Sequence, residues 1–215
     1  MSRVLICIPT IDKVDASFFR SVLGMRYNDG NDYSFTMRSN SLIYFARGDM
    51  ATEAINGKYD WMVSLDSDMV MEPDTVMRLV ASAQGKDFVT GLYFKRRLPT
   101  MPLILRALDW YEHEQMGPQE VAETYEDYPR DDVFRIAGCG FGCCVARVEM
   151  IKEMAIRYRM NPWTPLPRLS EDYSFCFRAK QMGYEMWCDS RIRPGHAGLH
   201  VYTQGDWDIQ RRVIG

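Results

Sequence analysis

Residues 61–71 read WMVSLDSDMVM, a short apolar run that ends in two aspartates separated by one serine. The run over 61–65 predicts a buried strand, because it is too short for an ordinary helix and turn-forming residues bound it. Burying a carboxylate is costly unless the charge is paired or coordinated. We therefore expect Asp66 and Asp68 where the strand leaves the core, facing water, a cation or both.

The segment after these carboxylates predicts a helix over 73–84, with Pro73 in its first turn and apolar residues at helical spacing. In open α/β sheets, ligands bind at such a strand end. Mg²⁺ and Mn²⁺ bind through one or two carboxylates together with substrate phosphates. The pattern predicts a metal and phosphate site, and the alternative is a solvated turn. A second pair, Asp206 and Asp208, lacks the preceding strand and is expected to be a chance copy.

The composition indicates one globular domain. The chain has 215 residues, of which 47% are hydrophobic, and no Gly/Ser-rich or Pro-rich linker divides it. A net charge of −3 argues against a general binder of nucleic acid or anionic membranes. The apolar runs are too short to span a membrane and the N-terminus lacks a signal-peptide pattern, so a soluble, cytoplasmic protein is expected.

Strands and helices are predicted to alternate along the chain, which implies a mostly parallel sheet with right-handed crossovers. Strands are expected at 4–8, 32–37, 61–65, 87–93, 103–105, 143–146 and 184–188, with another beginning at 134. Helices are expected at 15–25, 41–55, 73–84, 149–159 and 170–183. The acidic segment 109–132 is expected to be irregular.

Two further patterns have both a functional and a structural interpretation. The six cysteines read mostly as small buried hydrophobes, and the spacing of Cys139, Cys143 and Cys144 fits no standard zinc site. Glycines at 138, 140 and 142 do not have the spacing of a dinucleotide fingerprint. They predict either a floor for an acceptor substrate or a bulge that packs closely.

The C-terminal third offers a candidate base and two candidate metal ligands. Ser170 is a plausible N-cap, with Glu171 and Asp172 in the first helical turn. This is either a well-capped helix or a carboxylate that deprotonates a hydroxyl. His196 and His200 follow in a predicted loop, where a histidine is either a metal ligand or simply solvated.

The order of these motifs resembles that of GT-A fold glycosyltransferases, especially family 2-like enzymes, over roughly residues 3–200. The matching segments are Ile8-Pro9-Thr10, Phe45 to Asp49 around Arg47, Asp66-Ser67-Asp68, Ala137 to Gly142, Glu171-Asp172 and His196. The resemblance implies an α/β fold: a single GT-A (Rossmann-like) domain over 1–215, with a mostly parallel central sheet flanked by helices. Residues 1–94 would form the nucleotide-sugar-binding half and residues 95–215 the acceptor-binding half.

The resemblance also implies a function, which is transfer of a sugar from a UDP- or GDP-linked donor to a hydroxyl acceptor. Asp66, Asp68 and His196 would bind Mn²⁺ or Mg²⁺, and Asp172 would be the catalytic base. A base acting on the acceptor favours inversion, and retention stays open because some GT-A enzymes with the same metal motif retain. The donor-binding residues would be Pro9, Thr10, Arg47, Asp66 and Ser67, with Arg193 as a further phosphate contact. The basic run 95–97 would be solvated or would contact an anionic polymer as acceptor.

Two departures limit what the resemblance implies. Residues 38–40, Arg-Ser-Asn, include no aspartate at the end of the second strand, so the base of the nucleotide stays open. The Trp-rich motif of processive synthases is absent, which favours a non-processive enzyme. The alternatives are a nucleotidyltransferase of related fold, which the lack of glycine in residues 9–14 disfavours, and a non-catalytic sugar-nucleotide or glycan-binding module.

Overall fold

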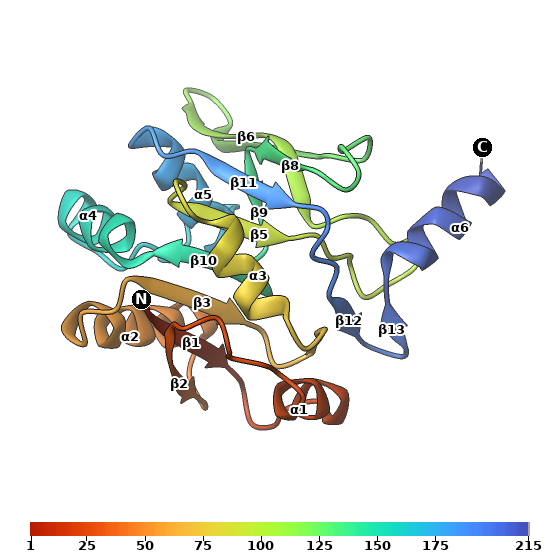
Figure 1. Ribbon diagram of the computed structural model, residues 1–215. Helices are drawn as coiled ribbons and strands as arrows, with labels where there is room; N and C mark the ends of the chain where they lie inside the picture. Colours follow the sequence, from red (N-terminus) through yellow and green to blue (C-terminus); the bar gives the residue numbers. More distant parts are fainter. Residues whose placement is uncertain (215) are drawn as a thin grey trace.

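The computed structural model describes residues 1–214 and has an α/β architecture (Figure 1). A seven-stranded sheet with the order β2-β1-β3-β10-β5-β11-β8 forms its centre. These strands are β1 (Arg3–Pro9), β2 (Asp32–Arg38), β3 (Trp61–Leu65), β5 (Phe88–Gly91), β8 (Val133–Ile136), β10 (Cys143–Arg147) and β11 (Met186–Asp189). The helices are α1 (Ala16–Leu23), α2 (Ile43–Asn56), α3 (Thr75–Ser82), α4 (Val148–Tyr158), α5 (Glu171–Gln181) and α6 (Gln204–Ile214).

The sheet is mostly parallel, as the sequence predicts. Strand β1 pairs in parallel with β2 and β3, and β11 pairs in parallel with β5. Strand β10 lies antiparallel between β3 and β5, and β8 lies antiparallel to β11. The carboxyl ends of β1, β3, β5 and β11 therefore meet at one edge of the sheet, and the start of β10 joins them there.

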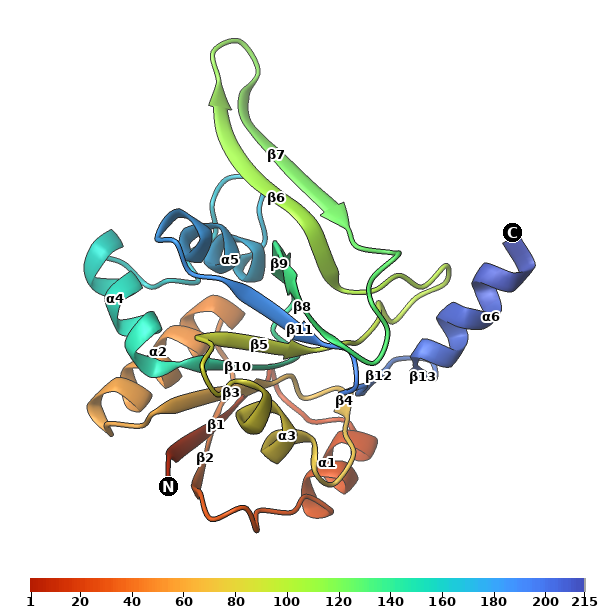
Figure 2. The same ribbon diagram turned by 45° about the horizontal axis from the view of Figure 1, so that its top comes forward.

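Both faces of the sheet are buried, which explains why its strands read as continuous apolar runs. In β1, Leu5 and Cys7 pack with residues of α2, α4 and α5, whereas Val4, Ile6 and Ile8 pack with residues of α1 and α3. Side chains of a strand alternate between faces, so each strand contributes to both cores. Helices α2, α4 and α5 thus cover one face of the sheet and α1 and α3 the other, whereas α6 stands apart from the sheet (Figures 1 and 2).

The expectation of an irregular segment over 109–132 is wrong. Strands β6 (Ile104–His113) and β7 (Gly117–Thr124) form a long antiparallel hairpin that projects from the domain (Figure 2), and β9 (Gly138–Cys139) pairs with its base. Most of its side chains beyond Leu108 are exposed on both faces, so no buried face imposes an alternating apolar pattern. The predicted strand 103–105 is only the start of β6.

Several predicted boundaries also change. Asp15 caps α1 as predicted, but Phe19 and Leu23 are exposed rather than buried. Pro73 precedes α3 and Asp74 is its N-cap. His196 lies on a short strand, β12 (Gly195–Ala197), and not in a loop. This strand pairs with β4 (Met69–Val70) and β13 (Val201–Tyr202), and α6 then ends the described chain.

Within residues 1–214, the helices are all too short or too polar to cross a lipid bilayer.

Candidate active site

The two aspartates of the 66–68 segment are held by backbone hydrogen bonds at the end of β3. The Asp66 N–H donates to the Gly142 carbonyl at 3.0 Å, and the Asp68 carbonyl accepts from the Ala197 N–H at 2.8 Å. Antiparallel pairing of β4 with β12 places His196 opposite Met69. A histidine from the end of the chain is thereby fixed beside Asp68.

His196 presents one free ring nitrogen to Asp68. Its Nδ1 lies 2.8 Å from the carbonyl oxygen of Phe94. A carbonyl can only accept, so Nδ1 carries the hydrogen and Nε2 is the nitrogen that faces Asp68 Oδ2, at 3.4 Å. Such a hydrogen bond to a backbone carbonyl is the usual way in which a metal-binding histidine is oriented. An imidazole nitrogen and a carboxylate oxygen are ligand types that suit a divalent metal ion.

Asp66 does not join this pair as a third ligand. Its Oδ1 accepts a hydrogen bond from Arg47 Nη2 at 3.1 Å, and among residues 1–214 no three Asp, Glu, His or Cys side chains converge as a metal site would require. The structure therefore brings Asp68 and His196 together and directs Asp66 toward Arg47. Asp66 as a metal ligand stays a prediction.

Asp68 has a second cationic neighbour, Arg96, whose Nη1 donates to the same Oδ2 atom. Burial alone would raise the pKa of Asp68, but His196 and Arg96 outweigh it and lower the pKa below its ordinary value. Sequence reasoning assigned the basic run 95–97 to solvent or to an acceptor and missed this contact. The available signal was a cationic run directly after a strand that ends at the ligand-binding edge.

Arg47 occupies an interior position between two carboxylates. It lies on α2 and its side chain is only 1% exposed. Besides the contact with Asp66, its Nε lies 3.4 Å from Asp172 Oδ1, and its guanidinium carbon lies 5.4 Å from the centre of the Phe141 ring. Burial opposes its charge, yet Asp66 and Asp172 raise the pKa of Arg47, so it stays a cation. Its predicted contact with the donor is untested, whereas its contact with both carboxylates is direct.

Asp172 lies in the first turn of α5 and is not the cap of that helix. The Ser170 hydroxyl accepts from the Tyr173 N–H at 3.3 Å, and the Asp172 carboxylate instead accepts from the Phe141 N–H at 3.1 Å. The side chain is 17% exposed. Burial raises the pKa of Asp172 to about 7, with Arg47 opposing the shift and Glu171 and Asp66 adding to it. A carboxyl with a pKa near neutrality suits a general base.

The glycines over 138–142 allow close packing around this carboxylate. A Cβ at Gly140 would lie 2.5 Å from the Tyr93 hydroxyl oxygen, and one at Gly142 would lie 3.1 Å from the Tyr93 ring. The Gly142 N–H also donates to the Tyr93 hydroxyl at 2.8 Å. The segment thus contacts both carboxylate residues: the Gly142 carbonyl accepts from the Asp66 N–H, and the Phe141 N–H donates to Asp172. A role as acceptor floor stays a prediction.

The remaining predicted donor residues lie at the same edge of the sheet. Pro9 ends β1, the Thr10 N–H donates to the Arg38 carbonyl at 2.9 Å, and the Ser67 carbonyl accepts from the Asp15 N–H at 3.0 Å. Arg193 is bound elsewhere, because it pairs with Asp131 and donates to the Ser190 carbonyl at 2.7 Å.

The other polar groups that the sequence singled out have partners of their own. His200 Nε2 lies 3.2 Å from Asp206, whose other carboxylate oxygen accepts from the Thr203 N–H, and Asp208 pairs with Arg130. The second Asp-x-Asp copy is thus engaged around α6 and away from Asp68. The sequence predicts that most of the cysteines are buried, and the structure buries all six as free thiols.

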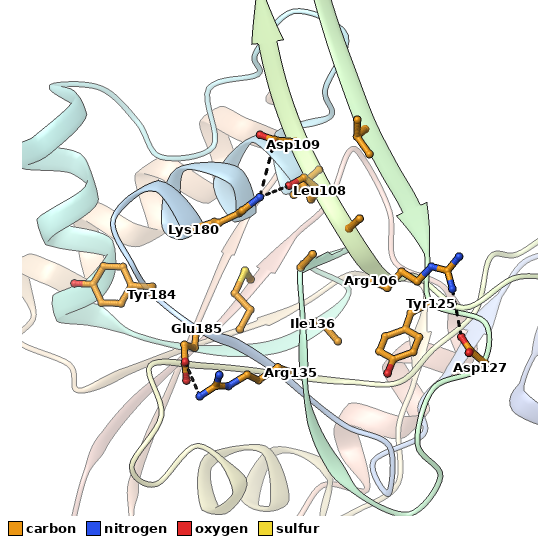
Figure 3. Close-up of a pocket in the computed structure, with 14 residues that line it drawn as sticks. Arg106, Leu108, Asp109, Tyr125, Asp127, Arg135, Ile136, Lys180, Tyr184 and Glu185 are labelled. Carbon is orange, nitrogen blue, oxygen red and sulfur yellow. Dashed lines mark hydrogen bonds and ion pairs between the residues drawn. The ribbon is translucent and has the colours of Figure 1, made fainter.

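A cavity of about 830 Å³ (Figure 3) lies outside this arrangement. Hairpin strands β6 and β7, strand β8, the end of α5 and the start of β11 surround it. Its three cationic side chains are already paired: Arg106 with Glu123 and Asp127, Arg135 with Glu185, and Lys180 with Asp109. Lys180 is two turns along α5 from Asp172, which at 1.5 Å per residue is about 12 Å.

No protein-family model and no curated protein sequence matches the chain. The solved structures to which it is similar include the following two. A197 from STIV superposes with a TM-score of 0.62 at 18% identity, covering 91% of this chain and 86% of that one. GalNAc-T7 with UDP, GalNAc and Mn²⁺ superposes with a TM-score of 0.59 at 13% identity, covering 91% of this chain but 44% of that one. The chain therefore has a GT-A-like, Rossmann-like α/β fold.

Proposed function

We propose that this protein is a metal-dependent, family 2-like glycosyltransferase that moves a sugar from a nucleoside diphosphate sugar to a hydroxyl acceptor. One observation carries the proposal. Asp68 and His196 face each other at the ligand-binding edge of the sheet, and Arg47 links the neighbouring Asp66 to the buried Asp172. The similar GalNAc-T7 structure, which contains UDP and Mn²⁺, supports a donor of this class.

Asp68 and His196 are the residues that would hold Mn²⁺ or Mg²⁺, with Asp66 sharing the ion or contacting the ribose. The bound ion would neutralise the charge that develops on the departing diphosphate. Pro9, Thr10 and Ser67 would line the nucleotide site. In this proposal, residues 1–94 form most of the donor-binding half and residues 95–215 form the acceptor-binding half. His196 on β12 belongs to the second range but contributes to the donor site.

Asp172 would act on the acceptor. Its carboxylate takes the proton of the acceptor hydroxyl as that oxygen forms a bond to the anomeric carbon. The bond from this carbon to the diphosphate breaks, and its electron pair leaves with the diphosphate. A base acting directly on the attacking hydroxyl implies inversion at the anomeric carbon. A raised pKa at Asp172, beside the carboxyl ends of the strands, favours a catalytic role over a non-catalytic binding module.

The test is a panel of UDP- and GDP-sugars with Mn²⁺ or Mg²⁺, in which release of the nucleoside diphosphate is followed. We expect one donor to be consumed in a metal-dependent reaction, and Asp172→Asn to slow transfer by a factor of about 10² to 10⁴. Glu149→Gln, which removes an exposed ion pair with Lys152 on α4, is the matched control and should leave the rate unchanged. A binding module would take up donors but release no diphosphate, and that result would overturn the proposal.

A further inference from the structure

The segment over 95–102, which joins β5 to β6, is a closed loop with a fixed base. The Lys95 N–H donates to the Met101 carbonyl at 2.9 Å, and the Thr100 hydroxyl donates to the Lys95 carbonyl at 2.7 Å. Gln210 of α6 bonds Thr100 twice, to its N–H at 2.8 Å and to its carbonyl at 3.1 Å. The base is thus anchored, whereas residues 96–99 are exposed.

Arg96 reaches from this loop to the candidate metal position. Its guanidinium donates to Asp68 Oδ2, the same oxygen that faces His196 Nε2 at 3.4 Å. Gly198 lies against this residue, since a Cβ there would be 3.3 Å from the Arg96 Cβ and 3.5 Å from the Arg96 carbonyl oxygen. The cation of Arg96 therefore shares one carboxylate oxygen with the place where a divalent ion would bind.

Breaking the ion pair between Arg96 and Asp68 costs little free energy. The Arg96 side chain is 58% exposed, and ion pairs at exposed positions are weak. A divalent cation held by Asp68 and His196 would replace the guanidinium at Oδ2. The freed guanidinium would then lie beside the metal, where the donor diphosphate must lie, and its planar fork matches phosphate oxygens.

We propose that Arg96 is a diphosphate-binding residue that exchanges partners. It neutralises Asp68 before the donor arrives, and it pairs with the diphosphate once the metal ion occupies Asp68. This inference rests on the proposed function, because it needs a nucleoside diphosphate at this edge of the sheet.

The proposal makes two predictions of opposite sign for Arg96→Ala. Without the competing guanidinium, Mn²⁺ alone should bind about 3- to 10-fold more tightly. UDP or GDP in saturating Mn²⁺ should bind about 10-fold or more weakly, because a charge-assisted contact to phosphate is lost. UMP and GMP have no second phosphate, so the substitution should lower their affinity less than that of UDP or GDP.

Arg97→Ala is the matched control. Arg97 is the neighbouring loop residue, it is exposed, and it forms no ion pair within residues 1–214. Its removal changes the net charge equally but should alter both affinities less than twofold at 0.15 M salt. Thermal unfolding of both variants would establish that they fold.

Calorimetric titration of Mn²⁺ and then of nucleotide distinguishes the outcomes. Arg96→Ala could bind Mn²⁺ and nucleotide like wild type, or it could bind both more weakly. Either result would mean that Arg96 does not exchange Asp68 for the diphosphate, so the inference would be wrong while the proposed function stands. If wild type binds neither UDP nor GDP in Mn²⁺, the proposed function and the inference both fail.

Discussion

At the scale of single residues, Arg47 is the group on which the candidate site depends. Its side chain is almost completely buried, and it contacts Asp66 at 3.1 Å and Asp172 at 3.4 Å. Removing one partner of a buried ion pair leaves an uncompensated charge, which is strongly destabilising. Two carboxylates that would otherwise repel each other are held together by this one cation.

We expect Arg47→Met to lower the free energy of unfolding by about 3 kcal/mol at pH 8, because Asp172 then loses its cation while ionised. The loss should be smaller at pH 5, where Asp172, with a pKa of about 7, is already protonated in the folded state. Urea unfolding at both pH values measures this. Arg38→Met, which breaks a half-exposed pair with Glu53, should cost at most about 1 kcal/mol. An equal loss for Arg47→Met at both pH values would mean that only packing is lost.

The raised pKa of Asp172 sets the direction of the pH dependence. A general base works only when deprotonated, so kcat/KM should rise with pH and level off above about 7. Stability should change in the opposite sense. Because the folded state binds the Asp172 proton more tightly than the unfolded chain does, the contribution of this group to the free energy of unfolding falls as pH rises from about 4 to 7. A rate profile that is flat between pH 5 and 9 would contradict the assignment of Asp172 as base.

At the scale of elements, the sequence predicts the strands and helices whose side chains pack in the core. Apolar runs such as 61–65 became strands because both faces are buried, and Asp15 and Ser170 were recognisable as helix caps. Hairpin β6–β7 was missed because its outer half is exposed on both faces and has no apolar alternation to read. The antiparallel insertion of β10 was also unpredictable, because the order of elements in the chain does not fix the order of strands in the sheet.

The hairpin provides a test of the proposed division into two halves. Trp110 pairs with Glu120 across it, so residues 111–119 can be replaced by Asn-Gly, which suits a two-residue hairpin turn. Because this tip is largely exposed, we expect the melting temperature to change by no more than about 2–4 °C and nucleotide affinity to be unchanged. Trp110→Ala should cost more, about 1–3 kcal/mol, since the indole N–H donates to the Pro167 carbonyl and the ring packs on Phe177. Lost nucleotide binding in the shortened protein would place the hairpin in the donor site instead.

At the scale of the whole molecule, the candidate site is assembled from distant segments. The turn between β3 and β4 supplies Asp68, the loop after β5 supplies Arg96, and β12 supplies His196. The sequence predicts Asp68, His196 and Asp172 as site residues by residue type and order, and the structure places His196 beside Asp68. It could not indicate that Arg47 is buried between carboxylates or that Arg96 contacts Asp68, since both contacts follow from tertiary packing.

The most direct test of the account is calorimetric titration of UDP and GDP into wild type, Asp68→Ala, His196→Ala and His200→Ala, each in Mn²⁺ and in EDTA. We expect wild type to bind one of these nucleotides only with Mn²⁺. Asp68→Ala and His196→Ala should lose about 10-fold or more in affinity, whereas His200→Ala, whose ring lies against Asp206, should bind like wild type. Unchanged Mn²⁺-dependent binding in Asp68→Ala would contradict the central claim that Asp68 and His196 form the metal and diphosphate site.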